Sequence, residues 1–137
     1  MNIDAIQNGI VIDHIPAGRA MRLYELLGLD RLDCSVAIIK NAHSRQSGKK
    51  DIIKIDGEFA LDEALIGYLA PEAKLNIIRG GERVEKRGVS LPDTLTNVLR
   101  CRNPRCITSV EQELDHVFRL MDAEHRIYRC IYCDAKA

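Results

Sequence analysis

The spacing of its cysteines is the feature that most limits how this chain can fold. Four of the five lie in the last quarter of the sequence, as the pairs CRNPRC and CIYC. The tail from position 101 onward is too short for a self-sufficient apolar core, because chains below about 40 residues usually need a disulfide or a metal. Two short cysteine loops can face one tetrahedral zinc ion. The sequence therefore predicts one structural Zn²⁺ per chain, held by Cys101, Cys106, Cys130 and Cys133.

Disulfides or inert thiols are the alternative for these cysteines. The N-terminal stretch MNIDAIQNGI has no cationic leader or apolar segment, and the aliphatic runs are far too short to span a bilayer, so we expect a cytoplasmic protein without membrane contact. In a reducing compartment, paired cysteines favour a metal over a disulfide.

His116 and His125 are competing ligands, but with four thiolates available we expect them at the surface or in a turn. Cys34 is expected to be a small core residue of an apolar strand.

Charge is balanced along the whole chain, with 20 basic and 20 acidic residues. The cysteine-rich tail, from position 101 onward, is also neutral, with six basic and six acidic side chains. Zinc ribbons often bind nucleic acid, so a stand-alone zinc-ribbon nucleic-acid-binding protein is an alternative function. Phosphate neutralisation dominates nucleic-acid affinity, however, and an uncharged module is poorly suited to it. We therefore expect a protein interface and no nucleic-acid partner.

The first 90 residues alternate between two apolar periods. Runs rich in β-branched residues predict strands, whereas apolar residues three and four apart predict helices. The predicted strands are 9–15, 34–40, 50–55 and 74–79, and the predicted helices are 17–27 and 61–69. This β-α-β-β-α-β order is that of the ferredoxin-like arrangement, an antiparallel sheet with two helices on one face. Residues 41–49 are expected to form a loop, and residues 82–86 could add a short strand.

A change of composition near Pro92 divides the chain. The segment SLPDTL, residues 90–95, is rich in turn residues and is expected to be a linker. Beyond it, ELDHVFRLM and RIYRC alternate like hairpin strands around DAEH, which predicts a zinc-ribbon-like module. The expected fold class is α+β, with a ferredoxin-like antiparallel sheet and two helices in residues 1–92. A small all-β zinc-ribbon-like domain is expected in residues 93–137.

The predicted strand 50–55 carries a basic stripe. Alternation places Lys50, Ile52 and Lys54 on one face and Asp51 on the other, which would be the core side. The two lysines are about 13 Å apart, at ~3.3 Å per residue, so they could serve opposite ends of a nucleoside triphosphate. The alternative is a solvated basic strand without a ligand.

The pair Asp13-His14, at the end of the first predicted strand, is equally open to two interpretations. It either begins a turn or directs polar groups toward a ligand. The chain has no Walker loop and no Gly-rich dinucleotide fingerprint, so phosphate binding would depend on side chains. It also lacks a nucleophile with its base, since Ser44 beside His43 falls in the expected loop. We therefore do not expect an enzyme.

Five ordered blocks carry a family resemblance across nearly the whole chain. IDAIQNGIVIDHIPAGRA, KKDIIKI, YLAPEAKLNII, SLPDTLTNVLRC and the cysteine quartet together resemble the regulatory chain of aspartate carbamoyltransferase. The resemblance implies a non-catalytic subunit of the enzyme that commits carbamoyl phosphate and aspartate to pyrimidine synthesis. It implies that nucleotides bind the N-terminal domain, with CTP and UTP inhibiting and ATP activating, and that the zinc domain docks on the catalytic chain. Regulatory homodimers would form through the N-terminal sheets and bridge catalytic trimers.

The resemblance also implies a set of effector-binding residues. Some would lie near the base and others near the ribose and phosphates. In chain order they are Ile3, Asp4, Ile6, Asp13, His14, Lys50, Ile52, Lys54, Asn76, Ile78 and Lys86. A tyrosine and a valine of the family's base pocket are replaced here by Gly81 and Arg83, and losing an aromatic wall forfeits about 1–3 kcal/mol of stacking. Base affinity or discrimination is therefore expected to differ from that of the family.

Overall fold

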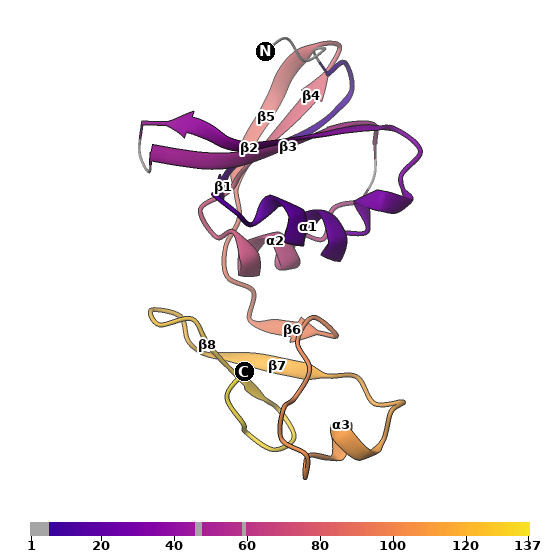
Figure 1. Cartoon of the computed structure of the whole chain (residues 1–137), viewed down its shortest axis with the longest axis vertical. Coiled ribbons are helices and arrows are strands. Elements are labelled where there is room, and N and C mark those ends of the chain that lie inside the picture. Colours follow the sequence, from indigo (N-terminus) through magenta and orange to yellow (C-terminus); the bar gives the residue numbers. More distant parts are fainter. Residues whose placement is uncertain (1–5, 46–47, 59) are drawn as a thin grey trace. The chain divides into compact units, whose positions relative to one another are not determined.

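A computed structural model describes residues 6–45, 48–58 and 60–137 (Figure 1). The chain divides into two compact units, Met1–Ser90 and Leu91–Ala137. None of the helices in the described residues is long and apolar enough to cross a membrane.

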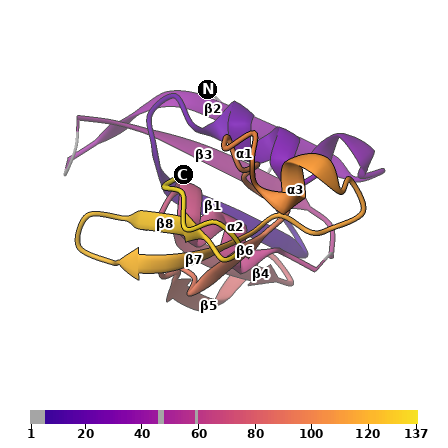
Figure 2. The same cartoon turned by 90° about the horizontal axis from the view of Figure 1, so that it is seen from below.

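The first unit is a five-stranded antiparallel sheet with the strand order β2-β3-β1-β4-β5. The strands are β1 (Gly9–Pro16), β2 (Ser35–Ser44), β3 (Gly48–Asp56), β4 (Lys74–Arg79) and β5 (Glu82–Gly88). The helices α1 (Ala20–Leu26) and α2 (Glu63–Leu69) lie on one face of the sheet (Figure 1, Figure 2), and a short 3-10 turn, η1 (Leu29–Arg31), follows α1. The predicted ferredoxin-like arrangement is confirmed, and β5 extends it by one edge strand.

The core of this unit lies between the sheet and the two helices. Alternate residues of β1 and β3 point into it, so Ile12 and Ile53 are completely buried against Leu23 of α1 and Ile66 of α2. Burying aliphatic side chains of this size contributes about 1.5–3 kcal/mol each. Neither α1 nor α2 covers the opposite face of the sheet, which is termed the outer face below.

Helix α1 begins three residues later than the apolar pattern predicts. Gly18 has a φ of +95°, which takes the chain out of the helical region before Ala20. The carboxylate of Asp51 accepts hydrogen bonds from the backbone N–H groups of Gly18 (2.9 Å) and Ala20 (3.1 Å). A buried side chain from β3 therefore sets the start of the helix, and residue spacing within the helix could not reveal it.

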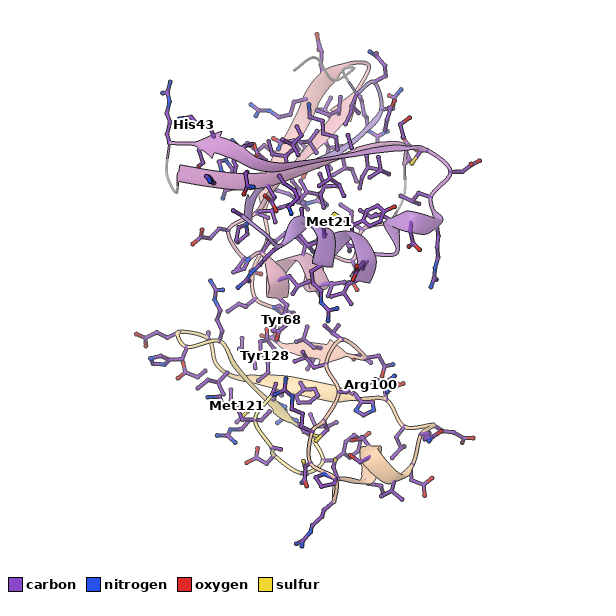
Figure 3. The ribbon with its side chains drawn as sticks, viewed as in Figure 1. Met21, His43, Tyr68, Arg100, Met121 and Tyr128 are labelled. Carbon is purple, nitrogen blue, oxygen red and sulfur yellow. The ribbon has the colours of Figure 1, made fainter. Side chains whose placement is uncertain are left out.

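The loop predicted for residues 41–49 is wrong over most of its length, because β2 continues to Ser44 and β3 already begins at Gly48. Asn41 has a φ of +58° and lies in a register shift between Ile39 and Ala42. A β-bulge of this kind lets a polar edge strand continue pairing. His43 lies near the end of this hairpin (Figure 3).

The second unit is a small antiparallel sheet with the strand order β6-β7-β8. Its strands are β6 (Thr94–Thr96), β7 (Val117–Asp122) and β8 (Ile127–Cys130), and the one-turn helix α3 (Ile107–Val110) is an addition to the expected all-β module. The linker predicted for residues 90–95 ends early, since Leu95 pairs with Phe118 and both are buried. Tyr128 is also buried (Figure 3), and its hydroxyl donates to the Pro92 carbonyl at 2.7 Å.

Candidate functional site

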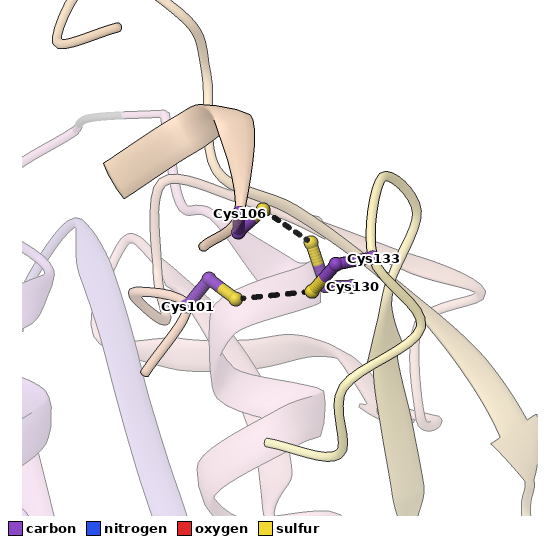
Figure 4. Close-up of side chains that lie close together, drawn as sticks. All are labelled: Cys101, Cys106, Cys130 and Cys133. Atoms are coloured by element: carbon purple, nitrogen blue, oxygen red, sulfur yellow. Dashed lines mark hydrogen bonds between the residues drawn. The ribbon is translucent and has the colours of Figure 1, made fainter. Parts of the chain in front are cut away.

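The four clustered cysteines of the second unit face one another (Figure 4). The Sγ atoms of Cys101 and Cys133 are 3.5 Å apart, those of Cys106 and Cys130 are 3.7 Å apart, and all four lie within 4.8 Å of one another. A tetrahedron with metal–sulfur bonds of about 2.3 Å has sulfurs separated by about 3.8 Å, whereas a disulfide needs about 2.05 Å. The spacing fits four thiolates around one metal ion and no disulfide.

The first cysteine pair is shaped by a turn around Asn103. The Asn103 carbonyl accepts from the backbone N–H of Cys106 at 3.0 Å and from the hydroxyl of Ser109 at 2.7 Å. Its side-chain oxygen accepts from the N–H of Arg105 at 3.0 Å. An asparagine that bonds the backbone two residues on is a typical turn former. This turn brings Cys106 back toward Cys101.

The second pair lies at the end of β8 and is held by the sheet. Cys130 pairs with Phe118, and its N–H donates to the Ala135 carbonyl at 2.9 Å. Asp134, with a φ of +63°, donates its N–H to the Cys130 carbonyl, while the Arg129 guanidinium donates to the Asp134 carbonyl, both at 2.9 Å. Arg129 thus braces the loop that turns Cys133 inward.

The thiols differ in acidity. The N–H of Ala135 lowers the pKa of Cys133 to about 6, and Thr108, whose hydroxyl lies 3.1 Å from the sulfur, lowers that of Cys106. Burial raises the pKa of Cys101 to about 12 and also raises that of Cys130. All four thiols must lose their protons to hold a cation, and a bound cation would compensate for the burial that opposes this at Cys101 and Cys130.

The two histidines of this unit lie in different surroundings. His125 is exposed in the turn after β7, where its Nδ1 is 2.7 Å from a carboxylate oxygen of Asp122. His116 is half-buried, and its Nδ1 accepts the backbone N–H of Cys101 at 3.2 Å. The sequence interpretation missed this contact, because nothing in the spacing of a single histidine indicates a bond to a backbone fifteen residues away. Cys34 precedes β2 and packs against the core of the first unit.

A row of three polar side chains and one valine crosses the outer face of the first unit. In the strand register Lys54 is opposite Val11, Val11 is opposite Asn76, and Asn76 is opposite Lys86. The row crosses four strands, so its two lysines are separated by roughly 14 Å at about 4.8 Å per strand. The Asn76 amide donates to the Val11 carbonyl at 3.4 Å.

An ion pair lies beside this row. Lys50 Nζ is 2.9 Å from Asp13 Oδ1, which also accepts the N–H of His14 at 2.7 Å. Burial on its own raises the pKa of Asp13, but the hydrogen bonds from Lys50 and His14 outweigh it and hold this pKa below the ordinary 3.8. His14 has a φ of +56° and lies in a register shift of β1, which redirects the strand at this point.

Two family models match the chain. The aspartate carbamoyltransferase regulatory chain, allosteric domain, matches residues 1–90, and the metal binding domain of the same chain matches residues 93–137. The regulatory chain of Clostridium botulinum (strain Hall) is 45% identical over 134 residues, which cover 98% of this chain and 92% of the relative. That of Bifidobacterium longum is 42% identical over 137 residues, covering 100% of this chain and 99% of the relative.

This chain belongs to the aspartate carbamoyltransferase regulatory chain family. It is therefore a non-catalytic subunit, with an allosteric domain and a metal-binding domain.

Most of the effector residues implied for the family lie in the first unit as described. Two of them, Ile3 and Asp4, lie outside the described residues. Ile6 is buried, Ile78 is opposite Gly9 in β1, and Ile52 is opposite Ile39 in β2. The remaining implied residues are Lys54, Asn76 and Lys86 of the row, and Asp13, His14 and Lys50 at the ion pair.

Arg83 and Gly81 differ from the residues expected to line the base pocket in the regulatory chain family. Arg83, opposite Ile78, points its guanidinium toward the Asn76 side-chain oxygen at 3.5 Å. Gly81 has a φ of +80° and donates its N–H to the Gln7 carbonyl at 2.9 Å. A bare backbone at Gly81 and a cation at Arg83 therefore stand where an aromatic and an aliphatic wall were expected.

His14 also lines an open pocket of about 870 Å³ at the edge of the first unit, and the lining includes Lys49, Glu72 and Lys74. These three residues are not part of the implied effector set. The strand register brings the lysines to the end of β1, since it places Lys74 opposite Asp13 and places Lys50, the neighbour of Lys49, opposite Pro16.

Proposed function

We propose that the outer face of the five-stranded sheet binds nucleoside triphosphates and that the chain reports their binding to an aspartate carbamoyltransferase catalytic chain. CTP and UTP are the expected inhibitors and ATP the expected activator of this step of pyrimidine synthesis. The family membership supports the general role, since its first domain is an allosteric domain.

The row on the outer face is the observation that carries the nucleotide proposal. Lys54 and Lys86 lie at its two ends with the Asn76 amide between them. Among the described residues neither lysine takes part in an ion pair, so both are available to a polyphosphate. Charge-assisted hydrogen bonds to phosphate are roughly twice as strong as neutral ones.

The ion pair extends the same site. Asp13 is an acceptor for a ribose hydroxyl, and its partner Lys50 can turn to a phosphate oxygen when one arrives. The His14 ring nitrogen Nε2 lies 3.9 Å from the other carboxylate oxygen of Asp13. A nucleotide would therefore replace one internal ion pair by contacts of its own, which links binding to a local rearrangement at the end of β1.

We propose that the metal of the second unit is one Zn²⁺, held by Cys101, Cys106, Cys130 and Cys133. Bound zinc supplies a divalent cross-link and no chemistry with a substrate, because four protein ligands leave no open position. Structural zinc contributes an apparent free energy of about 10–16 kcal/mol, comparable to the stability of a whole domain. The metal would thus fix the surface with which the module docks on the catalytic chain.

Regulation by this chain follows the logic of population shift. A nucleotide changes the activity of the catalytic chain only if it binds one arrangement of the regulatory chain more tightly than another. Pairing of two regulatory chains through their N-terminal sheets would let one dimer bridge two catalytic trimers.

The test mixes zinc-loaded or zinc-stripped full-length chain with catalytic trimers of the same enzyme and measures assembled mass and aspartate saturation. We expect assembly only with zinc, and a shift of the saturation curve on adding CTP or ATP. Assembly that ignores zinc would remove the docking role, and a saturation curve that no nucleotide moves would remove the sensing role. Retention on DNA that falls with salt would instead favour a nucleic-acid binder.

A further inference from the structure

The two cysteine pairs are attached to the second unit in different ways. Cys130 is the last residue of β8, so the sheet itself positions one pair. Cys101 belongs to no helix or strand and lies in the irregular segment between β6 and α3. Its backbone needs another support if its sulfur is to meet the other three.

Three side chains provide that support. Asn97, just after β6, donates its N–H to the His116 carbonyl at 2.7 Å, and its side-chain oxygen accepts the His116 N–H at 2.9 Å. The Asn97 amide group also donates to Asp115 at 2.9 Å. Asn97 has a φ of +58°, a conformation that asparagine tolerates better than most residues. His116 is thus fixed at both its backbone N–H and its carbonyl.

The ring of His116 extends this network to the metal ligand. Its Nδ1 accepts the N–H of Cys101 at 3.2 Å. An accepting Nδ1 places the proton of a neutral imidazole on Nε2. The bond restrains the backbone of Cys101 itself, and with it the direction in which the sulfur leaves the chain.

We propose that His116 is a positioning residue of the metal centre, which holds Cys101 in its ligating geometry before the metal binds. Partners of this kind orient ligands and typically change metal affinity by about 10–100-fold when removed. The inference rests on the metal site of the proposed function and is independent of nucleotide sensing and of docking.

The experiment measures the rate at which Zn²⁺ passes from the full-length chain to a chromophoric chelator. His116→Leu removes the acceptor, whereas His116→Asn keeps an acceptor oxygen near the position of Nδ1. His125→Leu is the matched control, because His125 is an exposed histidine of the same unit. We expect transfer about ten-fold faster for His116→Leu, near the wild-type rate for His116→Asn, and unchanged for His125→Leu.

Amide hydrogen exchange of the zinc-loaded chain separates positioning from a general loss of structure. The N–H of Cys101 should exchange faster in His116→Leu, while that of Cys130, held by the Ala135 carbonyl, should stay protected. Equal transfer rates for wild type and His116→Leu would overturn the proposal, as would a His116→Asn variant as fast as His116→Leu. A wild-type chain that binds no zinc would instead refute the metal site itself.

Discussion

Asp51 is a completely buried carboxylate whose replacement tests how the first unit is held together. It accepts three backbone N–H groups, those of Gly18 (2.9 Å), Ala20 (3.1 Å) and Asn41 (3.0 Å). Gly18 and Ala20 lie at the start of α1 and Asn41 lies in the bulge of β2, so one side chain ties both segments to β3. Asp51 is also next to Lys50, which makes it a support of the proposed nucleotide site.

The expected cost follows from what each donor can do after the carboxylate is removed. A hydrogen bond to a charged group contributes about 1.5–3 kcal/mol, and a buried donor left without a partner costs about 1–3 kcal/mol. Gly18 and Asn41 are exposed and can bond to water, whereas Ala20 is buried and cannot. We expect Asp51→Ala to lower the free energy of unfolding of this unit by about 3–5 kcal/mol. Asp51→Asn keeps one acceptor oxygen and should cost about 1–2 kcal/mol.

Urea titration of the zinc-loaded chain, followed by hydrogen exchange of peptides from the first unit, measures these changes. The control is Asp56→Asn, the same substitution at an exposed position of β3, which should stay within about 0.5 kcal/mol of wild type. If Asp51→Ala cost no more than that control, the three hydrogen bonds would not be stabilising the fold and the reasoning would be wrong.

Three further changes have definite expected outcomes. Lys50→Ala should raise the pKa of Asp13 in an NMR titration, because it removes the ion pair that lowers this pKa. Since the folded pKa is depressed, the Asp13 carboxylate contributes stability above pH 3.8 that is lost as the pH falls through the folded pKa. The variant should therefore lose less folding stability than wild type on acidification. Gly67→Ala, which in an exposed helix would stabilise by about 1 kcal/mol, should here destabilise by about 2 kcal/mol in thermal unfolding, because its Cβ collides with the Ser90 carbonyl. Chelation of zinc should abolish the exchange protection of β7 and β8 while that of β1 and β3 persists.

The alternation of apolar and polar residues predicted the strands correctly where a strand has one buried face. Alternation in β3 put Asp51 and Ile53 toward the core and Lys50 and Lys54 on the outer face, and their burial agrees. The cysteine spacing predicted that the four sulfurs would converge. Each close pair forms a short loop that turns both of its sulfurs to one side, and two such loops can face one metal ion.

The features that the sequence did not reveal depend on contacts between distant segments. The continuation of β2 through Asn41 requires a bulge whose N–H is bound by Asp51, ten residues away. The strand β6 has three residues and forms because Leu95 packs opposite Phe118. His116 contacts Cys101 across fifteen residues, and no periodicity of either segment encodes that meeting.

Calorimetric titration of CTP and ATP into the zinc-loaded chain tests the central claim, that the outer face of the sheet is the nucleotide site. Lys54→Ala combined with Lys86→Ala should weaken binding by a hundred-fold or more, since two charge-assisted hydrogen bonds are worth about 3 kcal/mol or more together. Lys136→Ala, a lysine of the other unit, should bind like wild type. Unchanged affinity in the double variant, or no binding by the wild-type chain, would contradict the account.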